Sequence, residues 1–127
     1  MSAFVVDTSA VLAVLLGEPG QSEALRLMEG ALISSVSVAE IVAKCVELRF
    51  SETVAIDYIE ASNLTVVDFN HELAIASGLL QRRAPKGVLS LGDRACLALA
   101  LRENATAVTA DRIWSTLDLG CPIELIR

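Results

Sequence analysis

The sequence lacks the features of a membrane-inserted or secreted protein. Its most apolar stretches, residues 11–16 and 95–101, are much shorter than the ~20 consecutive apolar residues that a membrane-spanning helix needs. The N-terminus has no cationic region, and Asp7 interrupts the segment that would form the apolar part of a signal peptide. We therefore expect a cytoplasmic protein with no membrane partner.

The sequence also lacks the cysteine and histidine patterns of disulfide frameworks and zinc sites. Cys45, Cys96 and Cys121 are odd in number and widely spaced, and His71 is the only histidine. These residues predict neither structural disulfides nor zinc coordination. We expect reduced, buried thiols and a surface position for His71.

Basic side chains are too few to hold a nucleic acid by diffuse positive charge. Ten Lys and Arg stand against sixteen Asp and Glu, which gives a net charge of −6. A polyanionic partner would need a mediator, and a bound divalent cation can act as one.

Short apolar runs alternate with longer segments of helical periodicity. The predicted strands are residues 3–6, 31–34, 64–67, 107–109 and 123–126, and the predicted helices are 10–16, 19–29, 38–48, 52–61, 72–82 and 91–102. No linker or repeat divides residues 1–127, so we expect a single domain. The alternation predicts an α/β fold, a three-layer α/β/α sandwich with a central parallel sheet of four to five strands.

Four acids recur where such a sheet binds ligands, outside the carboxyl ends of its strands. Asp7 and Asp111 follow predicted strands, whereas Glu40 and Asp93 stand in the first turns of predicted helices. Four converging carboxylates would repel one another and raise at least one pKa. A divalent cation removes that cost, and oxygen-only ligands favour Mg²⁺ or Mn²⁺.

Each acid also has a purely structural interpretation as a helix cap. The two that follow strands can accept hydrogen bonds from first-turn amides. Ser37 and Ser90 precede the other two by three residues, the spacing of a capping box. Glu40 can also pair with Lys44, four residues on. Taken singly, each acid is explained by capping, and only their shared position points to a site.

Over its whole length the chain resembles PIN domains, specifically the VapC-like ribonuclease toxins of VapBC toxin–antitoxin pairs. The resemblance is carried in order by residues 5–10 (VVDTSA), 35–40 (SVSVAE), 89–98 (LSLGDRACLA) and 108–112 (VTADR), with Trp114 and residues 122–127 (PIELIR) near the end. Some relatives carry a further acid after the last motif, where this chain has Ile113, Trp114 and Ser115. The number of metal ions bound at once is therefore left open.

The resemblance implies a metal-dependent endoribonuclease that leaves 5′-phosphate and 3′-hydroxyl ends. Its catalytic and metal-binding residues would be Asp7, Glu40, Asp93 and Asp111, with Ser9 and Thr109 in support. The implied cofactor is Mg²⁺ or Mn²⁺, and the implied partners are an RNA substrate, a VapB-like antitoxin and a second copy of the chain in a homodimer. The alternative is a catalytically inactive PIN domain that binds protein or RNA.

A basic cluster precedes the Asp93 motif. Arg82, Arg83 and Lys86 are candidates for contacts with RNA phosphates beside the site. The alternative is that these cations complement the dipole at a helix C-terminus. We expect Trp114 to belong to the core rather than to a base-stacking surface.

Overall fold

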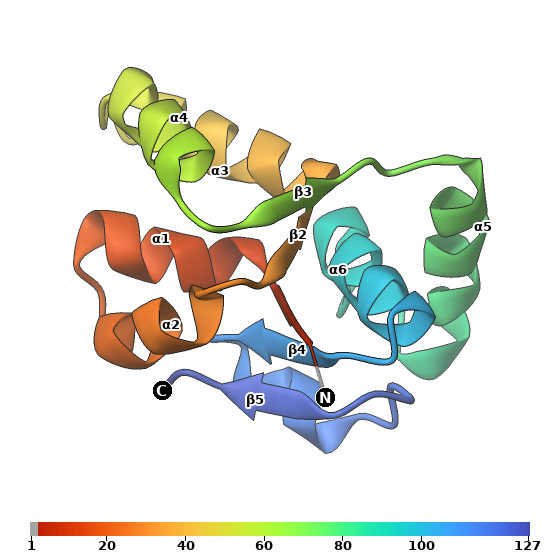
Figure 1. The fold of residues 1–127 in the computed structure, drawn as a ribbon. Coiled ribbons are helices and arrows are strands. Elements are labelled where there is room, and N and C mark those ends of the chain that lie inside the picture. The colour runs from red at the N-terminus through yellow and green to blue at the C-terminus, as the bar shows by residue number, and fades with distance from the viewer. Residues whose placement is uncertain (1–2) are drawn as a thin grey trace.

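The computed structural model describes residues 3–127, and a five-stranded parallel sheet forms its centre (Figure 1). The strand order is β3-β2-β1-β4-β5, and every pairing is parallel. The strands are β1 (Phe4–Val6), β2 (Leu32–Ser34), β3 (Thr65–Val67), β4 (Thr106–Thr109) and β5 (Ile123–Leu125). The sheet predicted from the apolar runs is confirmed, with five strands.

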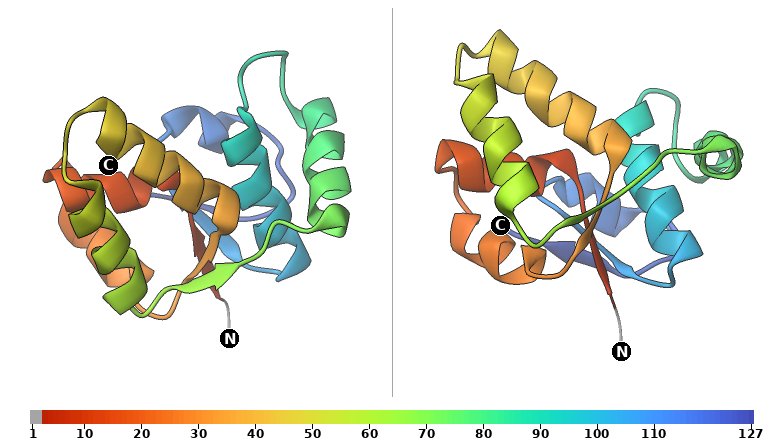
Figure 2. Two further views of the ribbon diagram at one scale, coloured as in Figure 1. Left: turned by 90° about the horizontal axis from the view of Figure 1, so that it is seen from above. Right: turned by 45° about the horizontal axis from the view of Figure 1, so that its top comes forward.

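Helices cover both faces of this sheet, as Figure 2 shows from two sides. They are α1 (Thr8–Leu16), α2 (Gln21–Met28), α3 (Ser35–Glu47), α4 (Glu52–Ala61), α5 (His71–Leu79) and α6 (Leu91–Arg102), with 3₁₀ turns η1 (Leu80–Arg83) and η2 (Arg112–Thr116). One face packs against α1 to α4 and the other against α5 and α6. The predicted three-layer α/β/α sandwich is therefore confirmed.

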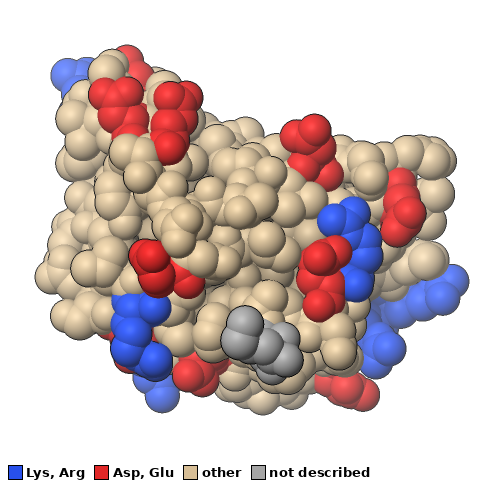
Figure 3. All heavy atoms as spheres, in the orientation of Figure 1, with Lys and Arg blue, Asp and Glu red and all other residues tan. Residues whose placement is uncertain are grey.

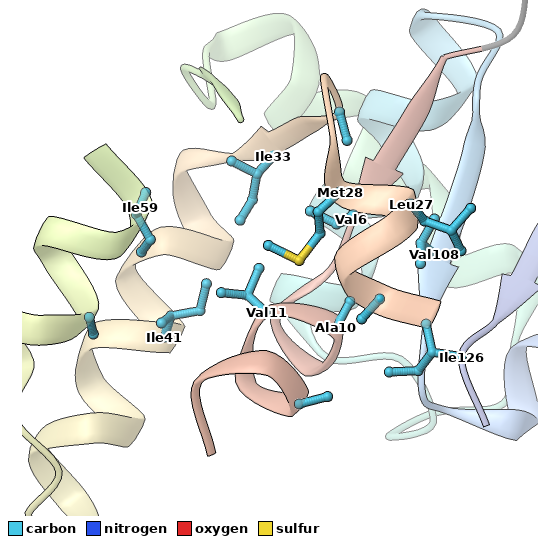
Figure 4. Close-up of a cluster of buried hydrophobic side chains, with 14 of the residues drawn as sticks. Val6, Ala10, Val11, Leu27, Met28, Ile33, Ile41, Ile59, Val108 and Ile126 are labelled. Atoms are coloured by element: carbon cyan, nitrogen blue, oxygen red, sulfur yellow. The ribbon is translucent and has the colours of Figure 1, made fainter. Parts of the chain in front are cut away.

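The core consists of two clusters of buried side chains, one on each face of the sheet. Val6 and Val108 point into the cluster beneath α1 to α4, which also holds Val11, Ile33 and Ile41 (Figure 4). The neighbouring residues of the same strands point into the cluster beneath α5 and α6. Successive side chains of a strand face opposite sides, so β1, β2 and β4 each contribute to both clusters.

The two clusters hold the tryptophan and the cysteines that were expected in the interior: Cys45 lies in the first, and Trp114 and Cys96 lie in the second. Trp114 is fully buried there, which confirms that it belongs to the core. Cys45 and Cys96 are buried free thiols, whereas Cys121 is only partly buried. His71 is exposed as the first residue of α5.

The strand order reverses beside β1, and this reversal positions the site. From β1 the chain moves outward to β2 and β3, and it then returns to the other side of β1 as β4 and β5. Val6 is in register with Val108, so both strands end at the same level. Ligands of such sheets bind outside this switch point, where Asp7 and Asp111 follow their strands.

Several predicted helix boundaries differ in the structure, and the helix predicted from residue 10 begins at Thr8. The helix predicted from residue 38 begins at Ser35 and is capped by Ser34, whose hydroxyl accepts from the amide of Val36. Ser37 is therefore interior to α3, and the predicted capping box between Ser37 and Glu40 is wrong. The helix predicted over 72–82 ends at Leu79 and tightens into η1.

The helix predicted from residue 19 starts at Gln21. Gly20 precedes it with φ of 91°, a left-handed conformation that glycine adopts without strain.

Among the described residues, no helix is long and apolar enough to span a membrane.

Candidate active site

The four predicted acids line one hollow at the switch point of the sheet. Its volume is about 420 Å³. The residues that line it are Asp7, Thr8, Ser9, Leu12, Glu40, Ala43, Lys44, Glu47, Asp93 and Asp111. They come from the ends of two strands and from the helices α1, α3 and α6, so the fold brings together acids that are up to 104 positions apart (111 − 7).

Asp7 is the most enclosed of these acids, with 5% of its surface exposed. Its Oδ1 accepts hydrogen bonds from the Ser9 amide at 2.8 Å, the Ser9 hydroxyl at 2.6 Å and the Ala10 amide at 3.2 Å. The hydroxyl of Thr109 donates to Oδ2 at 2.8 Å. Asp7 is thus both the N-cap of α1 and part of the hollow.

Burial raises the pKa of Asp7 to about 6. The hydrogen bonds from Ser9 and Thr109 lower the pKa but only partly offset this effect, and the negative charge of Asp93 raises it further. A buried carboxylate with a raised pKa in a cleft is typical of functional sites.

Ser9 and Thr109 join the two strand ends through hydrogen bonds. The Ser9 hydroxyl, which donates to Asp7, accepts from the amide of Ala110 at 2.8 Å. The Thr109 hydroxyl likewise accepts from the amide of Asp111 at 3.0 Å. These two side chains therefore link Asp7 to the backbone that carries Asp111.

Asp93 combines a capping role with a place in the hollow. The Ser90 amide donates to Asp93 Oδ2 at 3.0 Å, and the Asp93 amide donates to the Ser90 hydroxyl at 3.1 Å, which confirms the predicted capping box. Burial raises the pKa of Asp93, and the charges of Asp111 and Glu40 add to this effect. The predicted cap is confirmed for Asp93, which also lines the hollow, and its role in a site stays a prediction.

Asp111 lies at the outer rim of the hollow. It is exposed, and its Oδ1 caps η2 by accepting from the amide of Ile113 at 3.1 Å. Its charge nevertheless raises the pKa of Asp93. The electrostatic coupling runs from Asp7 through Asp93 to both Asp111 and Glu40.

Glu40 is held by Thr8, a residue that was not predicted to belong to the site. The hydroxyl of Thr8 donates to Glu40 Oε1 at 2.6 Å. The predicted pairing with Lys44 is replaced by an ion pair between Lys44 and Glu47 at 3.6 Å. Thr8 and Glu40 are 32 positions apart, and no local sequence signal reports a contact of that kind.

The predicted basic cluster does not line this hollow. Arg82 and Arg83 border another hollow with Leu101, near the C-terminal end of α6, and Arg83 lies 3.6 Å from Asp118. Lys86 is exposed in the loop before α6. On the face drawn in Figure 3, basic side chains gather mainly at the lower left and at the right, whereas acidic ones are scattered over the whole face. Lys44 is the basic residue that the structure brings to the acids.

The donor set suits a hard divalent cation. Carboxylate and hydroxyl oxygens are the ligand atoms available in the hollow, and these favour Mg²⁺ or Mn²⁺. Among residues 3–127, no three Asp, Glu, His or Cys side chains are grouped so that they enclose an ion directly. Mg²⁺ usually keeps several waters and takes only one or two carboxylates, so the arrangement fits a partly hydrated ion rather than a closed cage.

The PIN domain family model matches residues 4–119. The chain belongs to the PIN domain family. This PIN domain matches no curated protein, but it is similar to many solved structures. The match covers all five elements that supply the acids and their supporting hydroxyls.

Three of the similar structures come from toxin–antitoxin systems. A toxin–antitoxin complex from Klebsiella pneumoniae has a TM-score of 0.73 at 17% identity, covering 99% of this chain and 98% of that chain. DNA-bound VapBC from Salmonella typhimurium has a TM-score of 0.72 at 21% identity, covering 100% of both. VapC20 from Mycobacterium tuberculosis, described as a sarcin–ricin loop cleaving toxin, has a TM-score of 0.75 at 19% identity, covering 90% and 94%. At these identities the likeness establishes the fold.

Proposed function

We propose that this PIN domain is a metal-dependent endoribonuclease, the toxin of a toxin–antitoxin pair. The observation that carries the proposal is the convergence of Asp7, Glu40, Asp93 and Asp111 on one hollow at the switch point of the sheet. Membership of the PIN family and the likeness to toxin–antitoxin complexes and to VapC20 support it.

The site residues have distinct proposed roles. Asp7 and Asp93 are the principal metal ligands, because Asp7 is fixed by four hydrogen bonds and Asp93 by its capping box. Glu40 either binds the metal ion through a water molecule or orients the attacking water. Asp111, at the rim of the hollow, is an outer ligand of the metal ion. Ser9 and Thr109 orient Asp7, as supporting residues do at metal sites.

When bound, a divalent cation lowers the pKa of a coordinated water and offsets the charge of the scissile phosphate. The carboxylates hold that charge beside the RNA backbone and keep the water in line with the leaving 3′-oxygen. The P–O3′ bond breaks as the new P–O bond forms on the opposite side, while the attacking water gives up a proton to solvent and the leaving 3′-oxygen takes one up from solvent. The products are a 5′-phosphate and a 3′-hydroxyl.

The proposed antitoxin partner rests on the same comparisons. A toxin–antitoxin complex and VapBC are among the similar structures, and we propose a VapB-like antitoxin for this chain. We also propose that the chain forms a homodimer and acts in the cytoplasm. Several large apolar side chains on α3 and α4 are exposed, including Val46, Val54 and Ile56. Exposed apolar patches commonly mark protein-binding surfaces.

The test is cleavage of total RNA by purified, antitoxin-free protein with Mg²⁺ or Mn²⁺, with and without a chelator. Asp93→Asn should lose cleavage, and Asp57→Asn on the exposed side of α4 should keep it. Products should carry 5′-phosphates. Cleavage that survives in chelator would contradict the mechanism, and RNA binding without cleavage would favour the inactive binding module.

A further inference from the structure

Glu40 occupies a place formed by two residues outside the acidic set. We propose that Thr8 and Gly92 are positioning residues that hold the Glu40 carboxylate between the two principal ligands, Asp7 and Asp93. This inference rests on the proposed function, because it assigns these residues to the same metal site.

Thr8 supplies the hydrogen bond. As the first residue of α1 it directly follows Asp7, and its hydroxyl lies 2.6 Å from Glu40 Oε1. A hydrogen bond to an ionised carboxylate is shorter and stronger than one between neutral groups. Because Thr8 engages Oε1, Oε2 is left outside this bond and is available to a water or a cation.

Gly92 supplies the space. It is buried in the first turn of α6, directly before Asp93, and a Cβ placed on it would overlap the carboxylate of Glu40. Gly92 is not among the residues with positive φ. The backbone conformation of Gly92 is therefore open to other residues. A side chain at this position would instead displace the Glu40 carboxylate from the place it occupies.

The usual partner of a glutamate at this position does not hold it. Lys44 lies four residues after Glu40 on the same helix, a spacing that favours an ion pair. In the structure Lys44 instead pairs with Glu47, and Thr8 holds Glu40 across the hollow. Both contacts of Glu40 thus come from residues adjacent in sequence to another acid of the site.

The test compares Thr8→Val, which keeps the shape and removes the hydroxyl, with Thr8→Ser, which keeps the hydroxyl. Gly92→Ala adds the Cβ that displaces Glu40. The matched controls are Thr53→Val on the exposed side of α4 and Gly78→Ala in α5, where a Cβ would meet nothing within 4 Å. Each variant is measured for Mn²⁺ affinity by electron paramagnetic resonance, for kcat and KM on RNA, and for its melting temperature in chelator.

Loss of such a supporting contact should weaken Mn²⁺ binding or kcat by about 10- to 100-fold. We expect this for Thr8→Val and Gly92→Ala, with KM for RNA nearly unchanged and the melting temperature in chelator not lowered. Thr8→Ser should recover most of the activity, and both controls should match the original protein.

Equal losses for Thr8→Val and Thr8→Ser, or original Mn²⁺ affinity and kcat in Thr8→Val, would overturn the inference. Absence of RNA cleavage by the unchanged protein would overturn the proposed function. The Mn²⁺ affinities of the variants, compared with that of the unchanged protein, would still decide the roles of Thr8 and Gly92. Absence of Mn²⁺ binding by the unchanged protein would overturn both.

Discussion

At the scale of single residues, Asp7 carries the largest electrostatic cost in the site. Its carboxylate is almost fully buried, and burial raises its pKa from 3.8 to about 6 despite four hydrogen bonds. Between these pH values the folded chain keeps a proton that the unfolded chain has lost. Stability therefore falls as pH rises through this window, and the cost is complete above it, at roughly 3 kcal/mol or less.

Asp7→Asn should therefore stabilise the metal-free protein at pH 7.5. Asn caps helices as well as Asp does, so the main change is removal of the buried charge. Urea unfolding in chelator should give a higher free energy of unfolding for the variant at pH 7.5 and no advantage below about pH 4, where both forms are neutral. A variant less stable than the original protein at pH 7.5, with Asp57→Asn unchanged, would show that the charge is not destabilising.

At the scale of helices and strands, the caps fix the acids in place. Ser90 and Asp93 share a capping box that opens α6, the helix whose buried face forms much of the second core cluster. The Ser90 hydroxyl satisfies the first-turn amide of Asp93, and the amide of Ser90, which donates to Oδ2, orients the Asp93 carboxylate. The capping box thus both stabilises α6 and fixes the position of the Asp93 carboxylate.

Ser90→Ala should lower the free energy of unfolding by about 1 kcal/mol, the usual cost of losing an N-cap hydroxyl. Chemical denaturation of the variant measures this, with Ser22→Ala on the exposed side of α2 as the control. Unchanged stability of Ser90→Ala would mean that the amide of Asp93 gains nothing from this hydroxyl.

The elements were predictable because their signals are local. Apolar runs marked all five strands, and the Ser90 box and the acid after β1 followed from short-range patterns. The Ser37 box failed because Ser34, three residues earlier, already caps α3. The roles of Thr8 and Gly92 toward Glu40 depend on contacts between segments far apart in sequence, which no local pattern encodes.

At the scale of the whole molecule, basic residues are scarce, whereas the proposed RNA substrate is a polyanion. The net charge is −6, and the hollow collects four proposed ligands together with Glu47. Lys44 lies in the same hollow, and its ion pair with Glu47 is solvent-exposed, a kind of pair that stabilises little. We therefore predict that Lys44 exchanges Glu47 for a phosphate of the proposed RNA substrate.

Lys44→Met should raise KM for RNA several-fold and reduce the slope of log affinity against log salt by about 1, as expected for the loss of one phosphate contact. Binding of single-stranded RNA at several salt concentrations measures this slope. Lys86→Met, outside the hollow, should leave it unchanged. A reduced slope for Lys86→Met together with an unchanged slope for Lys44→Met would contradict this prediction. It would indicate that the basic cluster before α6 contacts the RNA.

The central claim is that carboxylates from separate elements act as one cation site, and Mn²⁺ titration followed by electron paramagnetic resonance tests it most directly. Asp7→Asn and Asp93→Asn should each weaken Mn²⁺ binding strongly, Glu40→Gln and Asp111→Asn should weaken it less, and Asp57→Asn should have no effect. Original affinity in both Asp7→Asn and Asp93→Asn would contradict the claim.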